Sequence, residues 1–287
     1  NADVRAWDGG LTLRCAWNDP VDGSSLCFDF GSAPLIVIKP QDTLKCSVMS
    51  GKEALPIVAI ERGRDSFPVD PPASGVEFNT PAGTGQTNLA VICMMNGARV
   101  KLSFSCFGPI QSETASKKAP WRLIADGEDL GFYYDPRNCR ARKVHENADA
   151  YSMPVWFVRM SAENANMLLS PRIRVADMLI PDEKTGELPG HVFPIDYRFL
   201  SNREALYDAL WARKLPVDRM RFLSGFRSSA HNKEVGSSSF SRHPYGDAFD
   251  FFFDGNNDGT ADDVTGDGKV TREDALAVIE AIEEAQY

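Results

Sequence analysis

The sequence contains little histidine and no close pairs of cysteine. Among 287 residues there are four histidines, and none of the six cysteines belongs to a C-x-x-C motif, which excludes a zinc knuckle built from such pairs. No apolar run approaches the length of a membrane span, and there is no signal peptide. The chain begins with Asn1 rather than methionine, so we expect an export signal to have been removed.

Basic residues are outnumbered by acidic ones. The formal net charge of −9 argues against a nucleic-acid partner. The excess is concentrated between Asp254 and Tyr287, where ten Asp or Glu residues stand against two basic residues. A local acidic excess of this size favours bound cations over a general property of the surface.

The cysteines all lie in the first half of the chain. An even number scattered among strand-like runs favours disulfides in an exported protein, and the alternative is a set of buried free thiols in a cytosolic one. We therefore predict an extracytoplasmic location, in the periplasm, the cell envelope or the medium. The six residues are Cys15, Cys27, Cys46, Cys93, Cys106 and Cys139.

Residues 1–112 have the pattern of an all-β, sandwich-like region. Short alternating or apolar runs are separated by turn signals, and Asn96-Gly97 is typical of a hairpin tip. This region contains no candidate for catalysis, so binding or spacing is the expected role. The strand-like runs lie at 11–17, 34–39, 89–95 and 99–106.

Two further regions follow along the chain. Residues 113–180 are interpreted as a linker and β-rich connecting region, because a segment rich in Ser, Lys and Ala precedes new strand-like runs. Residues 181–287 show helical signals. These are a capping box at Ser201–Glu204, a short helix at 230–235 that is closed by Gly236, and an amphipathic helix at 275–285.

The stretch from Ser241 to Asp250 reads S-R-H-P-Y-G-D-A-F-D and has the residues of a metal site. It places His243 seven residues before Asp250, and mixed nitrogen and oxygen ligands are typical of zinc. Asp250 is followed by three phenylalanines, and a carboxylate at the head of an apolar strand is costly unless a cation or hydrogen-bond donors satisfy it.

Two motifs carry a resemblance to a known family. The segment Ser224-Gly225-Phe226-Arg227 and the pattern S-x-H-x-x-G-x-A-x-D over 241–250 resemble the zinc D-alanyl-D-alanine carboxypeptidases. These are peptidoglycan peptidases, and they include the vancomycin-resistance dipeptidases. The second pattern is met at all five fixed positions, whereas Phe226 replaces a tyrosine in the first. The resemblance covers about 181–287 and implies an α+β zinc peptidase domain of the hedgehog/carboxypeptidase-like kind.

The resemblance also implies roles for individual residues. His243 and Asp250 match the first two zinc ligands. Arg227 matches an arginine that steadies the carbonyl or carboxylate of the substrate, and Ser241 matches a serine that helps to bind it. The implied reaction is the hydrolysis of a peptide bond near D-alanine in peptidoglycan peptides, by a carboxypeptidase or an endopeptidase that uses zinc to activate water.

The chain departs from the family in one respect. Family members carry a third histidine ligand, and a His or Glu general base, in a later segment that reads like H-x-x-x-V-H-V-D. No histidine follows His243 here, so we expect the sequence to be truncated before that segment. The alternative is a non-catalytic cell-wall or calcium-dependent binding protein that keeps the peptidase fold. His145, His191 and His231 are isolated and are not expected to bind metal.

The acidic tail contains two overlapping frames of a calcium loop. Each frame has oxygen donors at its first, third and fifth positions and glycine at the sixth. Hard oxygen ligands favour calcium, and the alternative is an acidic, solvated turn. We predict a structural calcium site. Its candidate ligands are Asp254, Asn256, Asp258, Thr260 and Asp262 in the first frame, and Asp263, Thr265, Asp267, Lys269 and Asp274 in the second.

Overall fold

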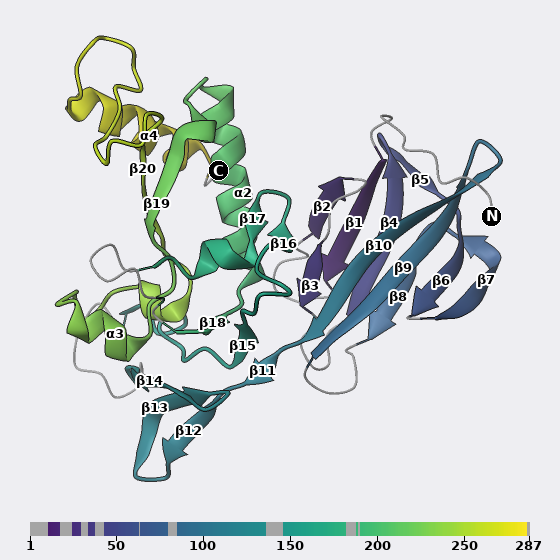
Figure 1. The fold of residues 1–287 in the computed structure, drawn as a ribbon, viewed down its shortest axis with the longest axis horizontal. Helices are drawn as coiled ribbons and strands as arrows, with labels where there is room; N and C mark the ends of the chain where they lie inside the picture. Colours follow the sequence, from purple (N-terminus) through teal and green to yellow (C-terminus); the bar gives the residue numbers. More distant parts are fainter. Residues whose placement is uncertain are drawn as a thin grey trace. The chain divides into compact units, whose positions relative to one another are not determined.

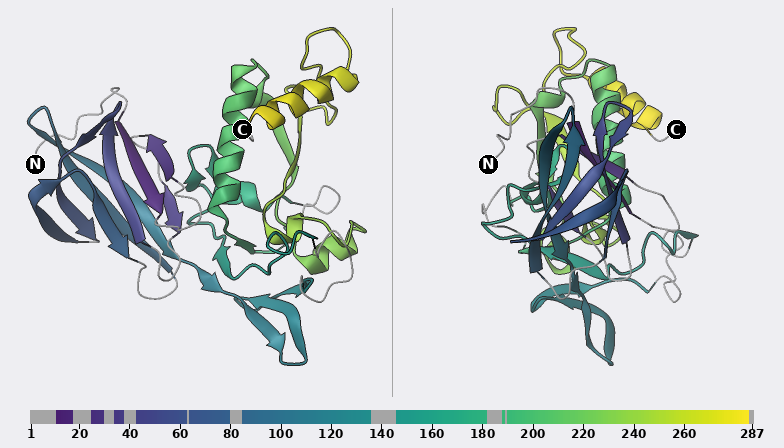
Figure 2. Two further views of the ribbon diagram at one scale, coloured as in Figure 1. Left: turned by 180° about the vertical axis from the view of Figure 1, so that it is seen from behind. Right: turned by 90° about the vertical axis from the view of Figure 1, so that its right-hand side faces the viewer.

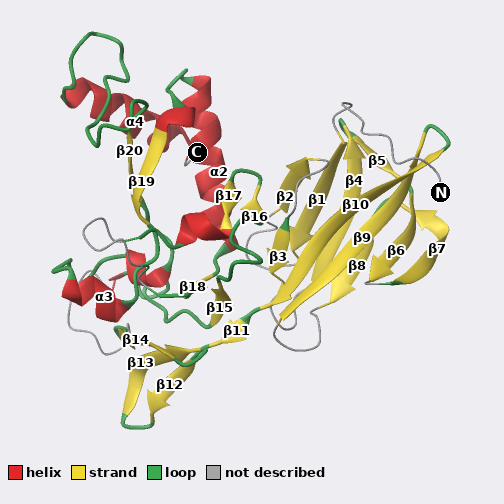
Figure 3. Ribbon diagram, in the orientation of Figure 1, coloured by secondary structure: helices red, strands yellow, loops and turns green. Residues whose placement is uncertain are grey.

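The computed structural model describes residues 11–17, 25–29, 34–37, 43–62, 64–79, 85–135, 146–181, 188 and 190–285. The chain forms two compact units, one made of residues 1–110 and 162–175 and the other of residues 111–161 and 176–287. Strands of several small sheets are the main regular structure among the described residues, and the C-terminal region is α/β (Figures 1 and 3). No helix within the described ranges is long and apolar enough to cross a membrane.

Two five-stranded sheets make up most of the described part of the first unit. They are the strands coloured purple to blue in Figure 2. In one sheet the strand order is β2-β1-β4-β5, with β8 also paired to β4, and in the other it is β3-β10-β9-β6-β7. The hairpin predicted at Asn96-Gly97 is confirmed, because both residues have positive φ between β9 and β10. The strands are β1 (Leu11–Trp17), β2 (Ser25–Asp29), β3 (Leu35–Val37), β4 (Thr43–Ser50), β5 (Glu53–Leu55), β6 (Ile57–Arg62), β7 (Asp65–Ala73), β8 (Val76–Asn79), β9 (Gly85–Met95) and β10 (Ala98–Gly108).

The two sheets share an apolar core. In β4, Leu44, Cys46 and Val48 are buried and alternate with more exposed residues, as expected for a strand with one buried face. The rings of Phe78 in β8 and Phe104 in β10 meet edge to face with centroids 5.5 Å apart, so side chains of the two sheets contact each other. The short strands β16 (Leu168–Ser170) and β17 (Ile173–Arg174) complete the unit.

The structure contradicts the expectation of disulfides for four of the six cysteines. Cys15, Cys46, Cys93 and Cys106 are buried, and the predicted disulfides are not formed among them. The sulfurs of Cys15 and Cys46 lie 3.8 Å apart at facing positions of β1 and β4. Burial raises the pKa of Cys93 and Cys106, which keeps both in the unreactive thiol form. Cys139 and the side chain of Cys27 lie outside the described residues.

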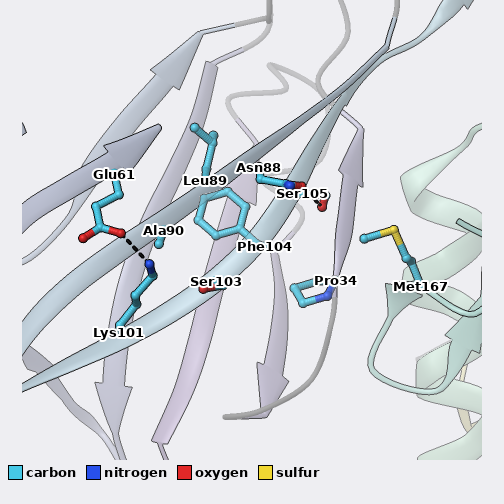
Figure 4. A pocket seen from close by; sticks show the side chains of 10 residues that line it. All are labelled: Pro34, Glu61, Asn88, Leu89, Ala90, Lys101, Ser103, Phe104, Ser105 and Met167. Atoms are coloured by element: carbon cyan, nitrogen blue, oxygen red, sulfur yellow. Dashed lines mark hydrogen bonds and ion pairs between the residues drawn. The ribbon is translucent and has the colours of Figure 1, made fainter. Parts of the chain in front are cut away.

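A hollow of about 300 Å³ lies on the first unit, lined by residues of β6, β9 and β10 (Figure 4). Four of its polar side chains are joined in pairs. Lys101 Nζ lies 2.5 Å from Glu61 Oε2, and Ser105 Oγ donates to Asn88 Oδ1 at 2.9 Å. These pairs already satisfy the groups that a ligand would use, so the hollow gives no specific sign of binding.

The described part of the second unit contains three small sheets and three helices. Residues 113–116 form a strand where a linker was expected, because they pair with 119–124 in a hairpin. The sheets are β12 (Glu113–Ser116) with β13 (Ala119–Ala125) and β14 (Glu128–Phe132), β11 (Ile110–Gln111) with β15 (Trp156–Arg159) and β18 (Val192–Pro194), and β19 (Met220–Ser224) with β20 (Asp250–Phe253). The helices are α2 (Tyr197–Ala212), α3 (Ser229–Glu234) and α4 (Arg272–Ala285), with short 3-10 turns η1 (Val175–Met178), η2 (Val217–Arg219) and η3 (His243–Tyr245).

Helix α2 begins earlier than its sequence signal predicted. Its N-cap is Asp196, whose side chain accepts a hydrogen bond from the amide of Arg198 at 2.9 Å, and Ser201 lies within the helix. The earlier cap allows Phe199 and Leu200 to join the buried face of the helix. The predicted helices in the segments of α3 and α4 are confirmed. A cluster of Leu206, Leu210, Leu215, Phe253 and Ala281 packs α2, β20 and α4 together and so fixes the end of β20.

Candidate metal centre

The antiparallel pair β19–β20 places two motif residues opposite each other. Ser224 is the last residue of β19, and Asp250 is the first residue of β20. The Ser224 hydroxyl donates a hydrogen bond of 2.5 Å to Oδ2 of Asp250. Asp250 remains accessible, with 54% of its side chain exposed. The carboxylate that was expected to need donors or a cation therefore has both a donor and open space.

Arg227 joins the same carboxylate. Its Nη2 lies 3.1 Å from Oδ2 of Asp250 and donates to Ser224 Oγ at 2.7 Å. The Nε of Arg227 is buried and has no hydrogen-bond partner among the described residues. A buried guanidinium donor without a partner is unusual.

The imidazole of His243 is held in the orientation of a metal ligand. The side chain lies on η3, and the residue is 8% exposed. Its Nδ1 lies 2.7 Å from the carbonyl oxygen of Gly225, and its Nε2 lies 3.3 Å from Oδ2 of Asp250. If Nδ1–H donates to the carbonyl, the lone pair of Nε2 faces the carboxylate, which is how metal-binding histidines are commonly fixed.

Two glycines allow the backbone to pack tightly around this group. A Cβ at Gly246, which follows η3 and has φ of +75°, would lie 2.4 Å from Pro194 Cγ. A Cβ at Gly225 would lie 2.6 Å from the carbonyl oxygen of Met178, which accepts a hydrogen bond from the amide of Phe226 at 2.9 Å. Both motifs therefore need glycine at these positions, because a Cβ would collide with the Pro194 ring or with the Met178 carbonyl.

The structure brings together His243, Asp250 and Arg227. Ser241 lies beside them, and its Oγ accepts from the amide of His243 at 3.4 Å. Ser224 was not predicted as a site residue, although it begins the S-G-F-R segment. Its position at the end of β19 is the signal that could have identified it, since Asp250 begins the paired strand.

The residues present fit two zinc ligands. His243 and Asp250 supply a nitrogen and an oxygen that face each other, and zinc accepts both kinds of donor. Among the described residues, no three His, Cys, Asp or Glu side chains are grouped to hold an ion. The Nδ1 of His231 lies 3.5 Å from Glu234 on α3 instead, and His145 lies outside the described residues.

Comparison with known families agrees with the motifs at this site. Residues 211–269 match the Peptidase M15 family. The C-terminal region therefore carries a peptidase M15 domain, and this family is zinc-dependent in general. The matched residues include the whole group of Ser224, Arg227, Ser241, His243 and Asp250. No curated protein and no solved structure gives a significant match to the chain.

The acidic loop of the M15 domain begins where β20 ends. Asp254 is fully buried at its side chain and pairs with Arg221, whose Nη1 lies 2.9 Å from its Oδ2. An Arg–Asp pair therefore lies at each end of the two paired strands. Arg221 and Asp254 form one pair, and Arg227 and Asp250 form the other. This arrangement places the candidate zinc ligand and the first candidate calcium ligand on one short strand.

The two calcium frames share one hydrogen-bond pattern. The carboxylate of Asp254 accepts hydrogen bonds from the amides of Asp258 and Gly259, at 3.0 and 3.1 Å. The carboxylate of Asp263 accepts hydrogen bonds from the amides of Asp267 and Gly268, which are again four and five residues later, at 3.3 and 2.6 Å. At the fifth positions, Asp258 and Asp267 each accept from the amide two residues further on, at 2.8 Å. Amide donation, first from Gly268, lowers the pKa of Asp263. The same set of hydrogen bonds therefore holds the backbone of both frames.

Asp274 ties the second frame to helix α4. Its Oδ2 accepts from the amide of Thr271 at 2.7 Å, and its Oδ1 accepts from the amides of Val264 and Thr265 at 2.9 and 3.0 Å. These donors, led by the amides of Thr271 and Thr265, lower the pKa of Asp274 to about 2. The carboxylate thus remains ionised at neutral pH while it closes the loop onto the helix. Calcium binding by this loop stays a prediction.

Proposed function

We propose that the C-terminal region is a zinc-dependent peptidase that cleaves a bond next to D-alanine in peptidoglycan peptides, as a carboxypeptidase or an endopeptidase. The observation that carries this proposal is the fixed imidazole of His243. Its Nε2 faces Asp250 within the segment that matches Peptidase M15. The resemblance of both motifs to the D-alanyl-D-alanine carboxypeptidases supports the substrate, and it supports the α+β carboxypeptidase-like fold expected for residues 181–287.

Each residue of the group has a chemical task in this proposal. His243 in its neutral form and Asp250 would hold zinc, which when bound polarises a carbonyl and acidifies water. Gly225 holds the imidazole so that Nε2 faces Asp250. Arg227, whose side chain is 18% exposed, offers charge-assisted hydrogen bonds to a substrate carboxylate or carbonyl. Ser241 adds a hydroxyl beside them.

A second candidate function is non-catalytic binding of cell-wall peptides. The observation that favours it is the presence of only two zinc donors at this site among the described residues. A catalytic zinc site has three protein ligands and an open position, so an incomplete set favours binding over turnover. Both candidates require recognition of the peptide, and they differ in whether product is released.

A hydrolysis assay with metal analysis separates these candidates. The purified chain is loaded with zinc and incubated with a stem peptide that ends in D-alanyl-D-alanine. We expect bound zinc, and we expect release of D-alanine that stops on chelation and returns when zinc is added. Bound zinc and bound peptide without product would favour the binding protein. A chain that retains no zinc at neutral pH would contradict the metallopeptidase proposal.

We also propose that the acidic loop binds calcium and stabilises the end of β20. Supporting this proposal are the repeated hydrogen-bond pattern of the two frames and the hard oxygen donors at their odd positions. The ion would neutralise part of the charge gathered in the loop. Because Asp254 follows β20 directly, order in the loop would extend to the strand.

Calcium should therefore raise the melting temperature of the chelator-treated protein. At about 100 times its dissociation constant, a ligand of the native state adds about 2.7 kcal/mol, or roughly 5–10 °C for a domain of this size. Asp267→Asn should lose most of this shift, whereas the control Glu280→Gln on α4 should keep it. Equal melting curves with and without calcium, measured in the presence of zinc, would rule out the structural role.

We place the protein outside the cytoplasm, because its proposed substrate is cell-wall material.

A further inference from the structure

A cavity of about 750 Å³ lies within the second unit, between the β13–β14 hairpin and the segment from α3 to η3. This volume is within the range of about 300–1,000 Å³ that is typical of ligand pockets. Phe132, Tyr133 and Tyr134 line it from the hairpin side, and Lys233 and Ser241 line it from the other. The cavity thus combines an aromatic wall with hydroxyl and charged groups.

The two walls are fixed to each other by specific contacts. A Cβ at Gly131 would lie 2.6 Å from the amide nitrogen of Ala230, so the hairpin packs directly on α3. The Ser229 hydroxyl donates to the carbonyl of Phe132. The buried hydroxyl of Tyr133 donates to the carbonyl of Pro244 at 3.0 Å. Because backbone groups on both sides take part, the cavity is formed before any ligand arrives.

The lining favours a peptide over other ligands. Phe132 is 61% exposed, which is unusual for a phenyl ring, and the guanidinium of Arg122 lies 5.6 Å from the centre of that ring. Lys233 and Glu234 place both signs of charge at the cavity, so it lacks the basic excess that a nucleic acid needs. An aromatic surface beside hydroxyls and mixed charges suits a chain with aliphatic side chains, amides and ionised groups.

Ser241 connects the cavity to the candidate metal centre. It lines the cavity, and its Oγ accepts from the amide of His243. A D-alanine leaving group is small, whereas the acyl part of the substrate is long. The cavity volume of about 750 Å³ therefore suits the acyl part of the substrate better than the small D-alanine.

We propose that this cavity binds the part of the peptide that precedes the scissile bond, and that Phe132 determines which side chain is accepted there. This assignment rests on the proposed function. It also gives the β13–β14 hairpin a role, although the hairpin lies before residues 211–269, which match the family. Specificity would thus be supplied from outside the matched segment.

Equilibrium binding tests the assignment without turnover. The full chain, with its metal removed by chelation, is titrated with a stem peptide ending in D-alanyl-D-alanine. Phe132→Ala should weaken peptide binding about 10-fold or more, because it removes the phenyl ring that the bound peptide would cover. Phe132→Leu should recover part of the affinity. The control Trp211→Ala removes a side chain that is 72% exposed on α2, and it should leave the dissociation constant unchanged.

The outcomes separate this proposal from the proposed function. If Phe132→Ala binds the peptide as tightly as the unaltered chain, the cavity assignment is wrong even where hydrolysis continues. Competition by the peptide-free disaccharide of the cell wall would also overturn it. Peptide binding that depends on Phe132 without any hydrolysis would support the cavity while contradicting the peptidase. Circular dichroism and zinc content should be the same for all variants, since Phe132 is exposed.

Discussion

Replacing His243 with alanine is expected to remove zinc from the protein and to abolish release of D-alanine. His243 is one of two donors at the site, and its imidazole is oriented by Gly225 for that purpose. Loss of an outer hydrogen-bond partner of a metal ligand already costs about 10–100-fold in affinity or activity, so loss of the ligand itself should cost more than about 100-fold. Zinc titration and the D-alanine assay measure the two effects.

The other described histidines provide matched controls. His191→Ala and His231→Ala remove imidazoles that do not contact Asp250, and both variants should keep the zinc affinity of the unaltered chain. The backbone amide of His191, rather than its ring, binds Glu128, so the substitution leaves that contact in place. Unchanged zinc content and activity in His243→Ala would refute the assignment of the metal centre.

The second large effect is expected from Gly225→Ala, which adds a single methyl group. That methyl would lie 2.6 Å from the carbonyl oxygen of Met178, so the backbone of residues 225–226 must move away. The carbonyl of Gly225 would then release Nδ1 of His243. We expect a loss of about 1–3 kcal/mol in the free energy of unfolding from overpacking, and a fall of about 10–100-fold in zinc affinity.

The control for this substitution is Gly127→Ala in the turn between β13 and β14. Gly127 has φ of +80° and no atom within 4 Å of a Cβ at that position. Its substitution should cost about 1–2 kcal/mol through the left-handed backbone alone, with no effect on zinc. Urea unfolding and zinc titration measure both quantities. Equal zinc affinity in Gly225→Ala and the unaltered chain would show that the carbonyl does not position His243.

Local sequence signals predicted the parts of the structure that depend on neighbouring residues. Asn96-Gly97 forms its hairpin, and α4 forms where the apolar spacing placed a helix. The seven-residue spacing of His243 and Asp250 also corresponds to a real proximity of 3.3 Å. Ser201 was a misleading start signal, because Asp196 offers a cap one turn earlier and brings more apolar surface into the core.

The remaining features depend on contacts between distant segments. The hydroxyl of Tyr133 meets the carbonyl of Pro244 across 111 residues of sequence, and no local pattern indicates such a contact. The pairing of Ser224 with Asp250 needs the register of β19 and β20. Disulfides were predicted from the even number of cysteines, but the facing sulfurs of Cys15 and Cys46 remain thiols in the core.

Strand β20, which has four residues, joins the candidate zinc site to the candidate calcium loop. Asp250 begins the strand and Asp254 follows it, so at about 3.3 Å per residue the two carboxylates lie roughly 13 Å apart along one backbone. Arg227 pairs with Asp250 at one end, and Arg221 pairs with Asp254 at the other. If calcium at one end changes the affinity for zinc at the other, thermodynamic linkage requires zinc to change the affinity for calcium by the same factor. The strand would then be a short reciprocal coupling element, whose strength can be measured by titrating either ion in the presence of the other.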